Sequence, residues 1–303
     1  MYDVIIIGGG PAGLTAGIYG VRAGLNTLVL SNSSVSGGQI LNTYEVDNFP
    51  GLPGISGMDM GKAFRDHCDK LGVEFATGRV TSIEDAGDHK NVVTKKVTYE
   101  TKAVIVATGA SNKKLMVPGE DDYCGCGVSY CATCDGAFYK DMTVAVVGGG
   151  DVALEDALYL ARACKQVYLI HRRDEFRGAK VLADAVLATS NITVCYDTVV
   201  ESINGADGKV VSSTIKNVKS GEVSELNMDG IFIAVGTTPN TGVISGLPAM
   251  DEVGYIKADE TGVTSIPGIF AAGDVRTKQL RQVSTAVGDG ANCICSVEKF
   301  LRK

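Results

Sequence analysis

The sequence lacks an uninterrupted apolar segment long enough to span a membrane. No apolar run reaches the roughly 18 residues that indicate a transmembrane helix, although hydrophobic residues make up 45% of the 303-residue chain. The first residues, MYDVIIIGGG, include neither a basic leader nor a small-residue cleavage site, so no secretory signal is expected. Together these absences predict a soluble protein of the cytoplasm.

The chain also lacks an excess of positive charge. Its formal net charge is −7 at pH 7, whereas a nucleic-acid-binding protein needs a strongly basic face. Small molecules and other proteins are therefore the expected partners. Because 303 residues exceed the usual size of one domain, two domains of roughly 100 to 200 residues each are predicted.

Two glycine-rich turns each follow an apolar strand and precede a helical pattern. The first has the form G-x-G-x-x-G over residues 8–13, and the second has the form G-x-G-x-x-A over residues 148–153. Such turns bind the pyrophosphate of a dinucleotide at the start of a helix. One turn alone could be only a tight turn, but two with the right flanks predict a flavin site and a nicotinamide site.

Neither unit has the acidic residue that usually follows the glycine turn by about 20 residues and binds ribose. Ser31 and Asn32 stand after the first turn, so uncharged hydrogen bonds are expected there. Four basic residues stand after the second turn: His171, Arg172, Arg173 and Arg177. Guanidinium groups suit the 2′-phosphate of NADP, which predicts a preference for NADPH over NADH. A solvated basic strand end is the alternative.

Three further apolar strands end in glycine, where the backbone can come close to a cofactor. Their terminal glycines are Gly109, Gly236 and Gly273. Asp274 follows the last of these, and ligands in open α/β sheets lie beyond the carboxyl ends of strands. Asp274 is therefore predicted to bind a sugar hydroxyl.

The segment CATCDG places Cys131 and Cys134 three residues apart and Asp135 next to them. With Cys124 and Cys126 they could form a four-thiolate metal site, but the spacing differs from that of zinc ribbons. A C-x-x-C beside βαβ units favours dithiol redox chemistry, with Asp135 as a proton donor. The remaining cysteines are interpreted as small core residues: Cys68, Cys164, Cys195, Cys293 and Cys295.

The segment CATCDG between the two glycine turns, followed by HRRDEFR, resembles the low-molecular-weight thioredoxin reductase family. The resemblance covers nearly the whole chain and includes GGQI (37–40), VDNFPG (46–51), ATGA, IFAAGDV and RQV (281–283). It implies an α/β fold with two Rossmann-like dinucleotide-binding domains. The NADPH domain (113–242) would be inserted into the FAD domain (1–112 and 243–303), and the protein would form a homodimer whose domains rotate.

The same resemblance implies that electrons pass from NADPH through FAD and the Cys131–Cys134 disulfide to thioredoxin. Cys134 would face the flavin, Cys131 would attack thioredoxin, and Asp135 would transfer protons. The implied FAD-binding residues are Gly8, Gly10, Pro11, Ala12, Gly13, Ser31, Gly38, Gln39, Asn48, Gly109, Gly273, Asp274, Arg281, Gln282 and Val283. The implied NADPH-binding residues are Gly148, Gly150, Asp151, His171, Arg172, Arg173, Arg177 and Gly236. No metal is expected.

Three positions depart from the family pattern: Asp151, and Cys124 and Cys126, which are additional to its cysteine motif. Three other functions are alternatives. Asp151 stands where the family often has asparagine, and a carboxylate near pyrophosphate is unfavourable unless it points elsewhere. The first alternative is a ferredoxin-dependent flavin thioredoxin reductase, which would lack the phosphate-binding arginines. The others are a reductase of another disulfide acceptor and a flavin-containing redox sensor that does not turn over.

Overall fold

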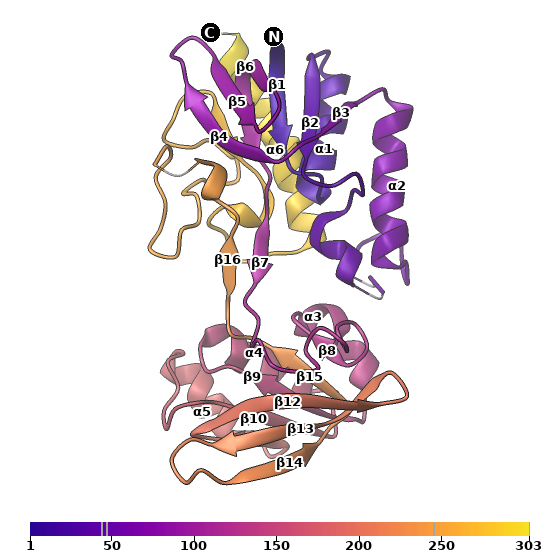
Figure 1. The fold of residues 1–303 in the computed structure, drawn as a ribbon, viewed down its shortest axis with the longest axis vertical. Coiled ribbons are helices and arrows are strands. Elements are labelled where there is room, and N and C mark those ends of the chain that lie inside the picture. The colour runs from indigo at the N-terminus through magenta and orange to yellow at the C-terminus, as the bar shows by residue number, and fades with distance from the viewer. Residues whose placement is uncertain (44, 47, 245, 303) are drawn as a thin grey trace. The chain divides into compact units, whose positions relative to one another are not determined.

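The computed structural model describes residues 1–43, 45–46, 48–244 and 246–302. Asp47, within the VDNFPG segment, lies outside the described residues. The chain divides into two compact units, one formed by Met1–Ser111 with Thr238–Lys303 and the other by Asn112–Thr237. The two connecting segments pair with each other as the short strands β7 (Ala110–Asn112) and β16 (Thr237–Pro239) (Figure 1).

The discontinuous unit is built on a mixed β-sheet. Its parallel strands are β3 (Glu74–Thr77), β2 (Thr27–Ser31), β1 (Tyr2–Ile7), β6 (Thr98–Val106) and β17 (Ile269–Ala271). Its antiparallel strands beyond β6 are β5 (Lys90–Thr94) and β4 (Val80–Asp85). Its α-helices are α1 (Pro11–Arg22), α2 (Gly57–Lys70) and α6 (Val283–Leu301), of which α1 packs against both others (Figure 1).

The core of this unit lies on both faces of the sheet, because successive residues of a strand point to opposite sides. Ile6 of β1 packs with Leu14 of α1 and Val297 of α6. Its neighbour Ile5 packs in a second cluster, which includes Val104 of β6. The central strands are therefore buried on both faces, as is usual for parallel sheets.

The inserted unit is built on a parallel sheet covered by helices on one face and by a second sheet on the other. The parallel strands are β11 (Ile192–Cys195), β10 (Gln166–Ile170), β9 (Thr143–Val147), β15 (Gly230–Ile233) and β8 (Val128–Ser129). The helices are α3 (Ala132–Asp135), α4 (Asp151–Ala161) and α5 (Lys180–Ala188). The antiparallel strands are β12 (Thr198–Ala206), β13 (Lys209–Asn217) and β14 (Val223–Asn227).

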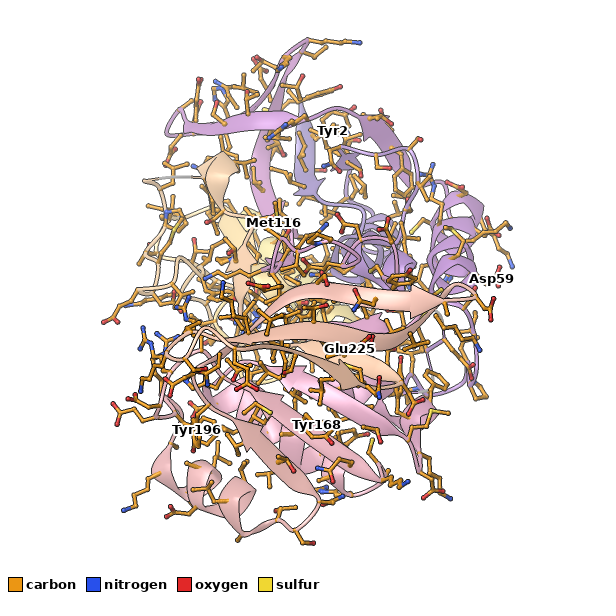
Figure 2. All side chains as sticks on the ribbon, turned by 60° about the horizontal axis from the view of Figure 1, so that its bottom comes forward. Tyr2, Asp59, Met116, Tyr168, Tyr196 and Glu225 are labelled. Atoms are coloured by element: carbon orange, nitrogen blue, oxygen red, sulfur yellow. A yellow bond between two sulfur atoms is a disulfide. The ribbon has the colours of Figure 1, made fainter. Side chains whose placement is uncertain are left out.

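Apolar clusters on the two faces hold these layers together. Val146 of β9 packs with Leu154 of α4, whereas its neighbour Val147 packs with Val200 of β12. Tyr168 of β10 packs against the second cluster (Figure 2). In both units a buried strand leads through a glycine turn into a helix, so the predicted α/β fold with two Rossmann-like units is confirmed.

Short 3₁₀ turns lie between the helices and strands, and some of them contain predicted site residues. They are η1 (Gly38–Asn42), η2 (Gly136–Tyr139), η3 (Gly242–Ile244) and η4 (Gly273–Val275).

Candidate active site

The first glycine turn joins β1 to α1, and its glycines have different surroundings. Gly8 has a φ of +129°, and a Cβ there would lie 2.1 Å from the Ala107 carbonyl oxygen. A Cβ on Gly13 would lie 1.9 Å from the Gly8 carbonyl oxygen, so the helix packs directly on the turn. A Cβ on Gly10 would meet no neighbouring atom closer than 3.9 Å. The open backbone at Gly10, before Pro11 begins the helix, can therefore receive a phosphate.

Gly38 and Ser31 lie beside this turn. A Cβ on Gly38 would lie 3.1 Å from the Gly10 Cα, and a Cβ on Gly9 would lie 3.0 Å from the Ser31 Oγ. Ser31 is buried at the end of β2, and its Oγ accepts a hydrogen bond from the Ser33 backbone N–H at 3.3 Å. Since this bond uses the oxygen as acceptor, the hydroxyl can still donate to a ribose.

Two buried polar atoms in the discontinuous unit have no hydrogen-bond partner among the described residues. They are Oδ1 of Asp274 and Nε of Arg281. Burial raises the pKa of the Asp274 carboxyl, although Lys278 and Arg281 act in the opposite direction. The Arg281 guanidinium lies 4.1 Å from the centre of the Tyr255 ring. Because unpaired buried polar groups are costly, an unpaired acceptor and an unpaired donor fit a polar ligand such as FAD.

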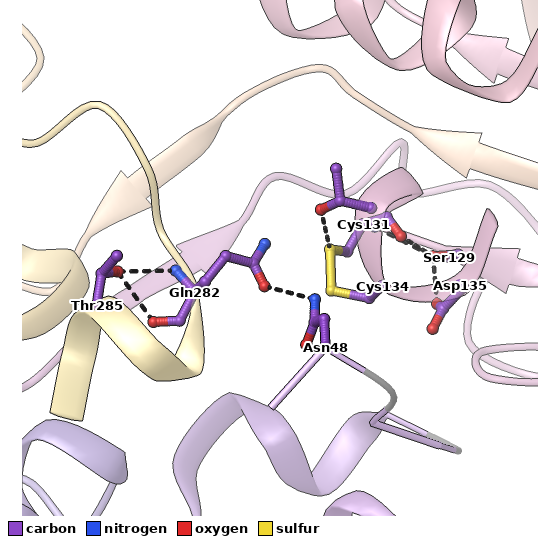
Figure 3. The surroundings of a disulfide bond; sticks show 8 residues. Asn48, Ser129, Cys131, Cys134, Asp135, Gln282 and Thr285 are labelled. Carbon is purple, nitrogen blue, oxygen red and sulfur yellow. Dashed lines mark hydrogen bonds between the residues drawn. A yellow bond between two sulfur atoms is a disulfide. The ribbon is translucent and has the colours of Figure 1, made fainter. Parts of the chain in front are cut away.

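Side-chain amides predicted to contact the flavin are held by partners of their own. The Asn48 Nδ2 donates to the Gln282 Oε1 at 3.1 Å (Figure 3). The Gln282 backbone N–H donates to the Thr285 Oγ1 at 3.1 Å, which caps the start of α6 at Val283. These bonds fix the position of the Gln282 amide at the N-terminus of α6.

Gln39 and Gly109 lie near the connecting segments. The Gln39 Nε2 donates a hydrogen bond to the Ala110 carbonyl oxygen. Gly109 has a φ of +69°, a conformation that favours glycine. Its carbonyl oxygen accepts a hydrogen bond from the Asn240 N–H at 3.0 Å. Gln39 and the first residue of β7 are thereby brought together within one unit.

The second glycine turn, between β9 and α4, repeats the arrangement of the first. A Cβ on Gly148 would lie 2.5 Å from the Ala234 carbonyl oxygen, whereas a Cβ on Gly150 would meet nothing within 4 Å. Gly236 has a φ of +108°, and its carbonyl oxygen accepts a hydrogen bond from the Lys113 N–H at 2.9 Å. The open backbone at Gly150 is therefore the part of this turn suited to a pyrophosphate.

The basic residues after β10 fall into two groups. His171 is only 5% exposed, and its Nε2 lies 2.9 Å from the Glu175 carbonyl oxygen. Burial lowers the pKa of this imidazole, so the neutral ring supports the loop. Arg172, Arg173 and Arg177 are exposed and form no ion pair within the described residues. Three guanidinium groups thus remain available to an anion, while the His171 ring is already engaged.

Asp151 is the first residue of α4, and its carboxylate points toward the basic segment. Its Oδ1 accepts a hydrogen bond from the Ala179 N–H at 2.6 Å. The Gly149 carbonyl oxygen accepts bonds from the Arg177 N–H at 2.8 Å and from the Gly178 N–H at 3.2 Å. The segment that follows β10 is thereby tied to the glycine turn by three hydrogen bonds.

Cys131 and Cys134 form a disulfide at the start of α3, with their Cα atoms 5.3 Å apart (Figure 3). The N–H groups of Cys134 and Asp135 both donate to the Cys131 carbonyl oxygen, at 3.2 and 3.1 Å. The Thr133 Oγ1 lies 3.5 Å from the Cys131 Sγ. The single helical turn therefore brings both sulfur atoms to one place, as the C-x-x-C spacing predicts.

Ser129 links the disulfide segment to Asp135 (Figure 3). Its Oγ accepts a hydrogen bond from the Cys131 N–H at 3.1 Å and donates one to the Asp135 Oδ2 at 2.5 Å. The Asp135 Oδ1 is buried and has no hydrogen-bond partner among the described residues. Burial raises the pKa of this carboxyl, and the Ser129 bond opposes the shift. Asp135 can therefore retain a proton at a higher pH than an exposed aspartate does.

The remaining cysteines depart partly from the predicted core positions. Cys124 and Cys126 are exposed free thiols in the turn before β8. Cys295 is exposed as well, so its assignment to the core was wrong. On α6, Cys293, Ile294 and Val297 face inward, and the helical period directs position 295 outward.

The described residues contain neither a candidate metal-binding cluster nor a helix that could span a membrane. No group of three or more His, Cys, Asp and Glu residues in this part of the chain could hold a metal ion. Among the same residues, no helix combines the length and the apolar character needed to cross a membrane.

No sequence pattern singled out a buried charged group formed by Arg276, Lys278 and Asp289. The Asp289 carboxylate accepts hydrogen bonds from the Arg276 Nη2 at 2.6 Å, the Lys278 Nζ at 2.9 Å and the Gly273 N–H at 2.8 Å. Asp289 therefore anchors the η4 turn that carries Asp274. The available signal was its place three residues after Ala286 on the buried face of α6.

Comparisons with known proteins agree over almost the whole chain. Residues 2–290 match the family described as pyridine nucleotide-disulphide oxidoreductase. All 303 residues align with a protein named thioredoxin reductase from Listeria innocua, with 43% identity and coverage of 95% of that protein. The protein of the same name from Bacillus subtilis is 41% identical, with coverage of 96%. The crystal structure of thioredoxin reductase from Streptococcus pyogenes matches with a TM-score of 0.95 and 46% identity, covering 100% of this chain and 98% of that one.

Proposed function

Since this chain belongs to the pyridine nucleotide-disulphide oxidoreductase family, we propose that it is a thioredoxin reductase. It transfers electrons from NADPH, through FAD and the Cys131–Cys134 disulfide, to oxidised thioredoxin. The observation that carries this conclusion is a disulfide next to a buried carboxyl, in a chain that aligns over its full length with proteins named thioredoxin reductase.

The proposed chemistry of the cysteine pair has two stages, which are reduction of its disulfide and thiol–disulfide exchange with thioredoxin. Bound FAD, held by residues such as Asp274 and Arg281, would supply the two electrons of an NADPH hydride to the disulfide. With two protons, these electrons convert Cys131–Cys134 to a dithiol. The Cys131 thiolate attacks one sulfur of the thioredoxin disulfide and releases the other as a thiolate. The Cys134 thiolate then attacks the Cys131 Sγ, which releases reduced thioredoxin and restores the starting disulfide.

The cofactor assignments rest on the polar residues that accompany each glycine turn, because the two turns themselves are alike. The orphaned polar atoms of Asp274 and Arg281 support FAD binding by residues 1–112 and 243–303. The exposed arginines that follow β10 support NADPH binding by residues 113–242, because guanidinium groups suit the 2′-phosphate.

We also propose that the protein is a homodimer in the cytoplasm. Light scattering that gives the mass of one chain would contradict the dimer.

NADPH oxidation by the purified, FAD-loaded protein tests the function directly. We expect rapid loss of the absorbance of NADPH when oxidised thioredoxin is present, slow loss without it, and little oxidation of NADH. Each missing step leaves a separate signature. If NADPH does not reduce the flavin, NADPH is not the electron donor, and reduced ferredoxin would be tested next. If NADPH reduces the flavin but added thioredoxin does not reoxidise it, thioredoxin is not the electron acceptor.

Asp135→Asn is expected to lower the thioredoxin-dependent kcat by about 100-fold, the usual scale for losing a general acid or base. Because burial raises the pKa of Asp135, the wild-type rate should fall as pH rises through that pKa, and the variant should lack this limb. Ser129→Ala removes the bond that opposes the shift, so its limb should move to higher pH. Identical pH profiles for the wild type and both variants would exclude Asp135 as the proton donor.

A further inference from the structure

We propose that Asp151 is a positioning residue that sets the preference for NADPH over NADH, while its charge weakens the binding of both nucleotides. This inference rests on the proposed binding of NADPH at the second glycine turn. The arginine loop, defined here as residues 171–179, connects β10 to α5 and carries Arg172, Arg173 and Arg177. Asp151 reaches this loop from the first position of α4.

The contacts of Asp151 hold the C-terminal part of the arginine loop against the glycine turn. Its Oδ1 accepts the Ala179 N–H at 2.6 Å, and a Cβ on Gly178 would lie 3.0 Å from the Asp151 backbone nitrogen. The other two ties, from the Arg177 and Gly178 N–H groups, end on the Gly149 carbonyl oxygen. Asp151 thus supplies a side-chain hydrogen bond that holds the loop at Ala179, two residues after Arg177.

The Arg173 backbone is held separately, because its carbonyl oxygen accepts the Asp197 N–H at 3.0 Å, so among the three arginines the Asp151 tie matters most for Arg177. Their side chains are exposed and form no ion pair with any described residue. A phosphate is bound well only when the guanidinium groups already stand in place, since ordering long side chains at binding is costly. Loosening the loop should therefore weaken the contact with the 2′-phosphate, which NADPH has and NADH lacks.

The charge of Asp151 acts differently from its hydrogen bond. The N-terminus of α4 and the open backbone at Gly150 favour an anion such as the pyrophosphate. A carboxylate at the first helical position repels that anion. Both nucleotides carry the pyrophosphate, so this repulsion weakens the binding of both.

Two substitutions at position 151 separate these effects. Asp151→Asn keeps an oxygen that accepts the Ala179 N–H but removes the charge. We expect it to tighten NADP⁺ and NAD⁺ binding, by about 3- to 10-fold, without reducing the preference for NADP⁺. Asp151→Ala removes the acceptor too, and we expect it to reduce the preference for NADP⁺ by about 5- to 10-fold. Calorimetric titration of the oxidised holoenzyme measures both constants without turnover.

A control variant and a nucleotide-free measurement complete the test. Glu155→Gln removes an exposed charge one turn further along α4 and should leave the ratio of Kd values unchanged. Hydrogen exchange of the Ala179 amide, without nucleotide, should be slow in the wild type and in Asp151→Asn but fast in Asp151→Ala. An Asp151→Ala protein that keeps the wild-type ratio, or exchanges Ala179 slowly, would overturn the proposal.

The arginines themselves distinguish failure of this inference from failure of the proposed nucleotide site. The double variant Arg173→Ala/Arg177→Ala should lose most of the preference for NADP⁺. If that preference survives, the phosphate site is wrong and the role of Asp151 falls with it. If the preference is lost there but kept in Asp151→Ala, the site is right and only the role of Asp151 is wrong.

Discussion

Cys131→Ser is expected to lower thioredoxin-dependent NADPH oxidation at least ~1,000-fold, because the variant lacks the nucleophile of a covalent step. Serine cannot form the Cys131–Cys134 disulfide seen here or a mixed disulfide with thioredoxin. The flavin should still be reduced by NADPH, since hydride transfer precedes the use of the cysteine pair. Stopped-flow absorbance of the flavin and steady-state oxidation with thioredoxin measure the two steps separately.

The two cysteines should behave differently when each is removed alone. Cys134→Ser leaves Cys131 free to attack thioredoxin but removes the thiol that resolves the mixed disulfide. We therefore expect a covalent complex with thioredoxin on a non-reducing gel for Cys134→Ser and none for Cys131→Ser. Cys124→Ser, which alters an exposed free thiol, is the control and should turn over normally. The reverse pattern of complexes would exchange the proposed roles of the two cysteines.

Asp289→Ala is expected to lower the free energy of unfolding by about 3–5 kcal/mol, the usual cost of removing one partner of a buried ion pair. The side chains of Arg276 and Asp289 are only 6% and 7% exposed, and that of Lys278 is 6% exposed. The substitution would leave two buried cations unpaired and the Gly273 N–H without its acceptor. Urea denaturation followed by circular dichroism, at a fixed FAD concentration, measures the loss.

An exposed ion pair provides the matched control for this prediction. The side chains of Lys62 and Asp66 are 72% and 58% exposed, so Asp66→Ala should change the free energy of unfolding by no more than about 0.5 kcal/mol. Equal losses for Asp66→Ala and Asp289→Ala would show that the buried charged group contributes nothing special.

The contribution of Asp289 should also depend on pH in a defined direction. Burial raises the pKa of its carboxyl, but the hydrogen bonds from Arg276 and Lys278 outweigh burial and lower it overall. A folded-state pKa below the unfolded value of about 3.9 makes the ionised group stabilising above that value. The stabilisation is lost as pH falls through the folded pKa. The difference in the free energy of unfolding between the wild type and Asp289→Ala should therefore become smaller only at acidic pH.

Features encoded by neighbouring residues could be predicted from the sequence. The glycine turns, the strands that precede them and the C-x-x-C turn depend on local backbone geometry, and the structure has them at the predicted residues. The resemblance to the thioredoxin reductase family is likewise confirmed. Local periodicity was sufficient for these features because each involves only one turn and its flanking elements.

Features that depend on contacts between distant residues could not be predicted in the same way. The sequence suggested that His171 binds phosphate, but the fold buries its ring against Gly149 and uses its Nε2 at a backbone carbonyl. The orientation of Asp151 depends on the Ala179 amide, 28 positions further along the chain. Asp289 and Arg276 meet only because α6 packs beside the η4 turn.

The pairing of β7 with β16 has a consequence for how such a chain can be assembled. The inserted unit begins at Asn112 and ends at Thr237, and next to these ends the Lys113 N–H donates to the Gly236 carbonyl oxygen at 2.9 Å. Segments whose ends lie close together can be inserted into a host fold without distorting it. The two ends of the inserted unit therefore join the rest of the chain at adjacent positions. We expect that the whole unit can be exchanged between related reductases.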